Sequence, residues 1–100
     1  MDVMDVLRAK ELRGNIIEIL YMRYGDEITI SMLRSFLRYK GYSSNNDIPK
    51  AIDYLSGDKK EFVFIDRNKD DYEDSKVSLT PLGVNLAEGD ITDVGVNIYE

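Results

Sequence analysis

The sequence of 100 residues contains no cysteine, no histidine and no tryptophan. Without cysteine, the chain can build neither a disulfide framework nor a thiolate zinc site. Without histidine, it lacks the side chain that most often transfers protons and binds metals near neutral pH. These absences argue against most enzyme classes, so we expect a protein with no catalytic activity, no metal site and no cofactor.

Glycine and proline are also scarce, with seven and two residues, and long hydrophobic runs are missing. A content of 43% hydrophobic and 32% charged residues is typical of a globular domain rather than a disordered chain. No apolar run approaches the roughly 18 residues that a membrane span requires. Asp2 and Asp5 stand where a signal peptide has basic residues. We therefore expect a soluble, cytoplasmic domain.

The first long segment with helical periodicity covers residues 5–24. Its apolar residues recur at three- and four-residue steps, which places them on one face of a helix, and Gly25 is a typical helix stop. Gly14 lies in the middle of this segment, where glycine costs about 1 kcal/mol relative to alanine. We therefore expect a closely packed neighbour at Gly14.

Two further helices follow a short apolar stretch at residues 28–30. The second helix is predicted to start with Thr29 or Ser31 as its N-cap and to end at Gly41. The third helix opens with the pattern [ST]-x-x-[DE] at residues 44–47, in which the serine oxygen and the carboxylate satisfy the first free backbone N–H groups.

The remainder of the chain is predicted to form two strands and a fourth helix. Residues 62–65 and 77–79 are short β-rich runs. Residues 66–76 between them lack periodicity and have almost no apolar content, so they are interpreted as an exposed hairpin loop. The fourth helix begins at Thr80-Pro81, with threonine as N-cap and proline in the first position, and ends at Gly89.

This order of elements is the layout of a winged helix-turn-helix domain. The sequence also resembles that family directly, because residues 52–55 (IDYL) end a helix just before the hairpin and residues 79–83 (LTPLG) are similar to the strand-to-helix junction of MarR-like, PadR-like and ArsR-like regulators. Residues 83–89 look like the ending of small phage-borne winged-helix proteins. The resemblance covers roughly residues 12–89.

The resemblance implies an α+β winged helix-turn-helix fold, with a three-helix core, a β-hairpin wing and a short C-terminal helix. We expect residues 1–89 to form this domain and residues 90–100 to form an extended tail. The function that the resemblance implies is DNA binding in transcription regulation, as a homodimer. Because winged helices also serve as protein-binding modules, the alternative is an acidic adaptor that binds another protein without direct DNA binding.

In a DNA-binding helix-turn-helix, the second helix of the motif enters the major groove and the preceding helix crosses the DNA backbone. Asparagine reads adenine, and lysine or arginine reaches guanine or phosphate. The predicted DNA-binding residues are Arg34, Arg38, Lys40, Asn45, Asn46, Lys50 and Tyr54.

These assignments have alternatives that the sequence leaves open. Asn45 and Asn46 also suit the start of a helix without any DNA contact. Arg34 and Arg38 also suit a solvated helix face.

The net charge of −6 is distributed unevenly along the chain. Residues 1–42 hold seven Lys or Arg and six Asp or Glu, a net charge of +1, whereas residues 43–100 hold six and thirteen, a net charge of −7. The loop at residues 66–76 holds three cations and five acids, a net charge of −2. Most DNA affinity comes from neutralised phosphates, so this wing would be repelled by DNA. We therefore expect weak DNA binding, or a dimer that holds its wings away from the duplex.

Both ends of the chain carry apolar residues beyond the needs of a three-helix core. Val94, Val96 and Ile98 alternate with other residues as in an edge strand. The alternatives are a dimer or partner interface and a cap on the domain's own core. The predicted contact residues are Val3, Met4, Leu7, Val94, Val96 and Ile98.

The acidic residues of the 66–76 loop match a calcium-binding loop only in part. Asp66, Asn68 and Asp70 occupy the first three ligand positions of an EF-hand. Asp71 then stands where that loop needs glycine, and Val77 stands where it needs glutamate. A solvated hairpin tip is therefore favoured over a cation site.

Overall fold

The computed structural model describes residues 2–42 and 47–98. In chain order the elements are α1 (Val3–Met22), β1 (Ile28–Thr29), α2 (Ile30–Tyr39), α3 (Asp47–Ser56), β2 (Val63–Asp66), the 3-10 helix η1 (Tyr72–Asp74), β3 (Lys76–Leu79) and α4 (Pro81–Ala87). This order matches the predicted one, with η1 as an addition. No helix within the described residues is long and apolar enough to span a membrane.

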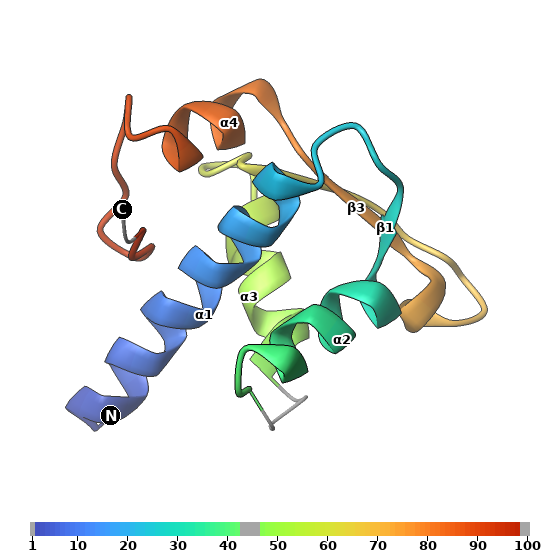
Figure 1. Cartoon of the computed structure of the whole chain (residues 1–100), viewed down its shortest axis with the longest axis horizontal. Coiled ribbons are helices and arrows are strands. Elements are labelled where there is room, and N and C mark those ends of the chain that lie inside the picture. The colour runs from blue at the N-terminus through green and yellow to red at the C-terminus, as the bar shows by residue number, and fades with distance from the viewer. Residues whose placement is uncertain (1, 43–46, 99–100) are drawn as a thin grey trace.

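The three strands form one antiparallel sheet in the order β1-β3-β2. β3 pairs with β2 through the hairpin, with Phe64 opposite Ser78, and with the short β1, with Ile28 opposite Val77. α2 and α3 both pack against α1. In Figure 1, α3 lies between α1 and α2, and the sheet extends to one side of these helices. This arrangement confirms the expected winged-helix fold.

The helix starts follow the capping chemistry of the sequence. Asp2 caps α1, which therefore begins two residues before the predicted Asp5. The Thr29 hydroxyl accepts a hydrogen bond from the Met32 N–H at 3.1 Å, which identifies Thr29 as the N-cap of α2. α2 ends as predicted before Gly41, which adopts a φ of 101°. The predicted start of α3 at residues 44–46 lies outside the described residues.

The LTPLG junction joins the hairpin to α4 through two close contacts. The Thr80 hydroxyl donates to the Glu61 carbonyl at 2.5 Å and accepts from the Gly83 N–H at 3.0 Å. A Cβ atom at Gly83 would overlap the Phe62 carbonyl. Glycine at this position therefore allows α4 to pack directly on the strand backbone.

One hydrophobic core connects all the helices and the inner face of the sheet. Ile16 and Ile17 of α1 are fully buried, and they share this core with Leu33 of α2 and Ile52 of α3. Val77 supplies the contribution of β3. The apolar positions that predicted three helices are therefore the positions that hold these helices together.

The 66–76 loop joins β2 to β3 and most of its residues are exposed, as expected of an exposed hairpin loop, and hydrogen bonds within it give it a defined shape. The Asn68 side chain accepts hydrogen bonds from the backbone N–H groups of residues 70 and 71, and the Asp71 carboxylate accepts from the Glu73 N–H. Ser75 is fully buried and its hydroxyl accepts from the Asn68 N–H. The expected exposed hairpin loop is therefore confirmed, and it is ordered by side chain to backbone hydrogen bonds, which leave no hydrophobic periodicity in the sequence.

The described part of the tail folds back on α1 instead of forming the extended strand that its alternation favours. Asp93 and Val96 form an isolated bridge, and the Asn97 N–H donates to the Lys10 carbonyl at 3.1 Å. Figure 1 shows this segment, in red, alongside α1. A Cβ atom at Gly14 would overlap the Asn97 carbonyl, which confirms the predicted close neighbour of Gly14.

Candidate nucleic-acid interface

The outward face of α3 carries charges of both signs. Asp47, Lys50 and Asp53 follow one another at three-residue steps and are exposed, whereas Ile48 and Ile52 point into the core. Local periodicity explains this division, because α3 is amphipathic and packs against both α1 and β2. The helix that would enter the major groove therefore presents one cation between two acids.

Three of the predicted cations lie on the open surface of α2 and α3. Arg38 and Lys50 are exposed and form no ion pair within residues 2–42 and 47–98. Lys40 lies 3.9 Å from the Glu18 carboxylate, at the limit of an ion pair. Lys40 and Lys50 line the same groove between α1 and the start of α3.

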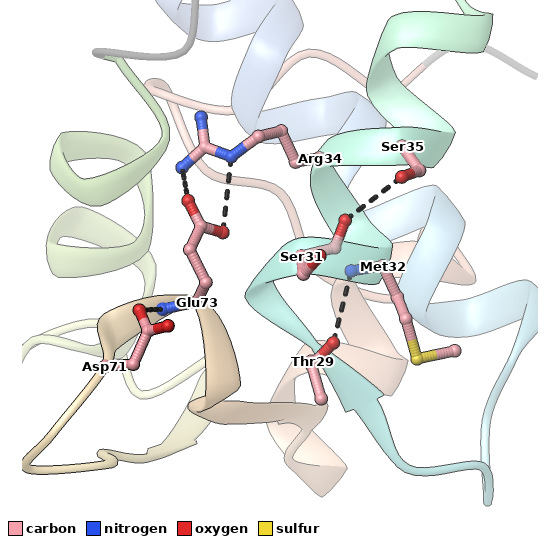
Figure 2. Close-up of polar contacts among 7 residues, drawn as sticks. All are labelled: Thr29, Ser31, Met32, Arg34, Ser35, Asp71 and Glu73. Atoms are coloured by element: carbon pink, nitrogen blue, oxygen red, sulfur yellow. Dashed lines mark hydrogen bonds and ion pairs between the residues drawn. The ribbon is translucent and has the colours of Figure 1, made fainter.

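Arg34 differs from these three cations because its guanidinium is held by the loop of the hairpin. Its Nη2 lies 2.6 Å from Glu73 Oε1, and its Nε donates to Oε2 at 3.3 Å. Figure 2 shows the two contacts running from α2 to the turn of η1. The Arg34 side chain is only 14% exposed. The predicted phosphate-binding cation is therefore engaged by a carboxylate of its own chain.

A second ion pair joins the same loop to α3. Arg67 Nη2 lies 3.1 Å from Asp53 Oδ1, and both side chains are more than half exposed. Tyr72 lies near both ion pairs, and its hydroxyl is buried without a hydrogen-bond partner among the described residues. Burial is the main cause that raises the pKa of Tyr72 above its usual value. The loop is thus fastened to both helices of the helix-turn-helix.

Tyr54 is turned toward the tail of the chain. Its hydroxyl donates to the Asp93 carboxylate at 2.6 Å, and the Arg13 guanidinium lies 4.0 Å from its ring centroid. Lys60 Nζ lies 2.7 Å from the other Asp93 oxygen. Burial opposes the ionisation of Asp93, but the hydrogen bonds from Lys60, Tyr54 and the Gly95 N–H outweigh it and lower the pKa of Asp93. This cluster joins α1, α3 and the tail.

Two of the predicted DNA-binding residues and the predicted absence of a metal site remain to be considered. Asn45 and Asn46 lie outside the described residues. No group of three or more acidic side chains in the described part of the chain is arranged to hold a metal ion.

The six predicted partner-contact residues fall into two groups. Val3, Met4 and Leu7 are exposed along the first turns of α1, and Val94 is 87% exposed. Val96 is 6% exposed and belongs to the hydrophobic core, and the partly buried Ile98 packs against this core. The burial of Val96 and Ile98 is therefore accounted for within this chain, as the alternative of a cap on the domain's own core implies.

Several residues that organise this surface escaped the sequence analysis. Glu73 belongs to the loop that was interpreted as a solvated hairpin tip, Asp53 was not singled out, and Asp93 lies in a tail that was considered only for its apolar residues. Their partners are 14 to 39 positions away in the sequence. The one local signal was Gly14, because a glycine inside a helix indicates that another segment packs there.

The comparisons with known proteins address the fold. No protein-family model matches the sequence, and no curated protein matches it. The crystal structure of a MepR mutant from a multidrug-resistant S. aureus clinical isolate superimposes on this chain with a TM-score of 0.61 and 18% sequence identity. The chain has a winged-helix fold. The match covers 77% of this chain and 51% of the MepR chain, so the winged-helix chain spans about half the length of that protein.

Proposed function

We propose that this winged-helix protein binds duplex DNA and acts in transcription regulation. The observation that carries the proposal is the placement of Lys50 and Arg38, exposed and unpaired among the described residues, on the two helices of a helix-turn-helix. In this fold class α3 enters the major groove and α2 crosses the backbone. We assign Lys50 to a base edge or a phosphate, and Arg38 and Lys40 to phosphates.

The charge distribution predicts modest affinity. Asp47 and Asp53 flank Lys50 on α3, and the 66–76 loop has a net charge of −2 from three cations and five acids. Each neutralised phosphate contributes about 0.9 to the slope of log affinity against log salt concentration. With two or three such contacts, we expect a shallow slope and binding that is strongest at low salt.

Fluorescence anisotropy with a random pool of labelled duplexes tests the proposal. The double variant Lys50→Ala and Arg38→Ala removes two cations from each protomer, so the slope should fall by about two contacts, or roughly 1.8, for each protomer bound. Lys59→Ala is the matched control, because Lys59 is exposed in the turn after α3, beyond its C-terminal end. If the wild-type protein shows no binding to the pool at low salt, the proposal is wrong.

A second candidate function is protein binding by an acidic adaptor. The observation that favours it is the pair of exposed carboxylates on α3, Asp47 and Asp53, together with the acidic loop beside them. A basic protein partner should then remain bound to the immobilised chain after nuclease treatment. Loss of the partner on nuclease treatment would count against this candidate and in favour of contact through nucleic acid.

We further propose that the protein acts as a homodimer through the first turns of α1. Val3, Met4 and Leu7 expose apolar surface there, and Figure 1 shows this end of α1 projecting beyond the other elements. A two-fold dimer would present two copies of α3 to successive turns of the duplex.

A further inference from the structure

The contact between Arg34 and Glu73 has the geometry of a phosphate contact. A guanidinium binds carboxylates and phosphates in the same bidentate manner, with two parallel N–H···O hydrogen bonds. Arg34 lies on α2, the helix that crosses the DNA backbone in a helix-turn-helix. Glu73 presents both of its carboxylate oxygens to Arg34, at 2.6 and 3.3 Å. The carboxylate therefore engages the same guanidinium N–H groups that would bind a backbone phosphate.

We propose that Glu73 competes with DNA phosphate for Arg34, so that the 66–76 loop restrains DNA binding by its own chain. This inference rests on the proposed function and adds a regulation of the same site. While Glu73 holds Arg34, the protein offers one cation fewer to the duplex. When a phosphate replaces Glu73, Arg34 joins the cations of α2 and α3.

The surroundings of the pair hold Glu73 in place and still leave it accessible. The Asp71 carboxylate fixes the backbone of Glu73, and the Arg67–Asp53 pair fastens the loop to α3. Yet 39% of the Glu73 side chain is exposed to solvent. A carboxylate released from this site returns to water, so an exchange avoids the large cost of leaving a buried charge unpaired. The pair can therefore open without unfolding the domain.

The test compares two variants that remove the same charge from the same turn. Glu73→Gln removes the carboxylate that holds Arg34. Asp74→Asn removes an exposed carboxylate that forms no ion pair within the described residues. Anisotropy with the random duplex pool should show that, for each protomer bound, Glu73→Gln tightens binding roughly fivefold to tenfold at 0.1 M salt and steepens the salt slope by about 0.9. Asp74→Asn should leave the slope unchanged.

Arg34→Ala supplies the second half of the test. In the wild-type background it should change the salt slope less than in the Glu73→Gln background, because Glu73 competes with phosphate for Arg34. In the Glu73→Gln background it should abolish the gain. Circular dichroism checks that each variant is folded, and Glu73→Asp replaces Glu73→Gln if that variant unfolds. Glu73→Asp keeps the charge but shortens the side chain, so it should give a smaller gain.

Each outcome bears on one of the two proposals. Equal gains from Glu73→Gln and Asp74→Asn would mean that only the total charge of the loop matters, and the competition model would be wrong. Suppose that the wild type binds DNA, that Lys50→Ala weakens this binding, and that Glu73→Gln does not strengthen it. The competition model is then wrong, whereas the proposed DNA binding stands. If no variant binds, Glu73→Gln included, then the proposed function itself is wrong.

Discussion

The Asp93 carboxylate joins separate elements of the chain through three donors. Tyr54 of α3 and Lys60 bond one oxygen each, and the Gly95 N–H bonds the oxygen that Tyr54 uses. Only 10% of the Asp93 side chain is exposed. Hydrogen bonds to a charged group at this depth contribute more than those of an exposed pair. A single residue of the tail thereby influences the orientation of α3.

We predict that Asp93→Asn lowers the free energy of unfolding by about 1–2 kcal/mol at pH 7. The pKa of Asp93 is lowered below 3.8, so its contribution is complete above that pH and is lost as the pH falls through the folded-state pKa. The hydrogen bond from Lys60 to Asp93 raises the pKa of Lys60, so the contribution of the pair also ends as the pH rises through that higher value.

Urea unfolding of wild type and variant at several pH values measures this difference. The gap in stability should be constant from about pH 5 to pH 9 and should close at acidic pH. Asp90→Asn, an exposed acid of the same tail, is the control and should show no gap. A gap that does not begin to narrow as the pH falls below 3.8 would contradict the assignment.

Gly14 allows a second prediction for a single residue. In an isolated helix, Gly14→Ala would stabilise by about 1 kcal/mol. Here the new Cβ would overlap the Asn97 carbonyl, so we expect net destabilisation and displacement of the tail from α1. Thermal unfolding gives the sign, and Ser35→Ala on the exposed face of α2 is the control. A higher melting temperature for Gly14→Ala would show that the tail does not pack on α1.

At the scale of elements, the tail acts as an additional layer of the core. Its backbone bonds to α1 through the Asn97 N–H, and the Arg13 guanidinium donates to the Gly95 carbonyl at 3.0 Å. Val96 completes the hydrophobic core from this side. The alternating apolar residues of this segment lie in a turn and not in a strand, with Val96 buried and Val94 exposed.

These two valines provide a matched pair of variants. We predict that Val96→Ala lowers the free energy of unfolding by about 1.5–2.5 kcal/mol, because it removes two buried methyl groups and leaves a cavity. Val94→Ala, at a side chain that is 87% exposed, should change it by less than about 0.5 kcal/mol. Chemical denaturation measures both. Equal effects would mean that the tail does not belong to the core.

The elements themselves could be predicted because their signals are local. Thr29, Thr80 and the apolar periodicity of α1 act within one or two turns of chain, and the structure follows them closely. The arrangement of the charged side chains could not be predicted in the same way. Arg34 meets Glu73 and Tyr54 meets Asp93 only after folding brings distant segments together. Sequence therefore predicts the helices of the candidate interface better than it predicts which of their cations are available.

At the scale of the whole molecule, the net charge of −6 does not describe each surface. The 66–76 loop is acidic, whereas α2 and α3 carry exposed cations. Ion pairs fasten the acidic loop to α2 and α3, which neutralises part of its charge and part of theirs. Arg38 and Lys50 are left without such a partner in the described residues. A single copy thus has few unpaired cations on α2 and α3 within the described residues, and a dimer that doubles them would gain affinity through two linked contacts.

We predict that the wild-type protein sediments as a dimer and that Leu7→Glu combined with Met4→Glu sediments as a monomer. Both side chains are exposed on α1 in the single chain, so the added charges should disturb the interface but not the fold. Met22→Glu, at an exposed position near the other end of α1, is the control and should remain a dimer.

Circular dichroism verifies that all variants keep their helical content. A wild-type protein that sediments as a monomer, or an unchanged dimer in the double variant, would contradict the proposed interface. Because only the dimer presents two copies of α3, the monomeric variant should also show a salt slope of about half the wild-type value in the anisotropy experiment.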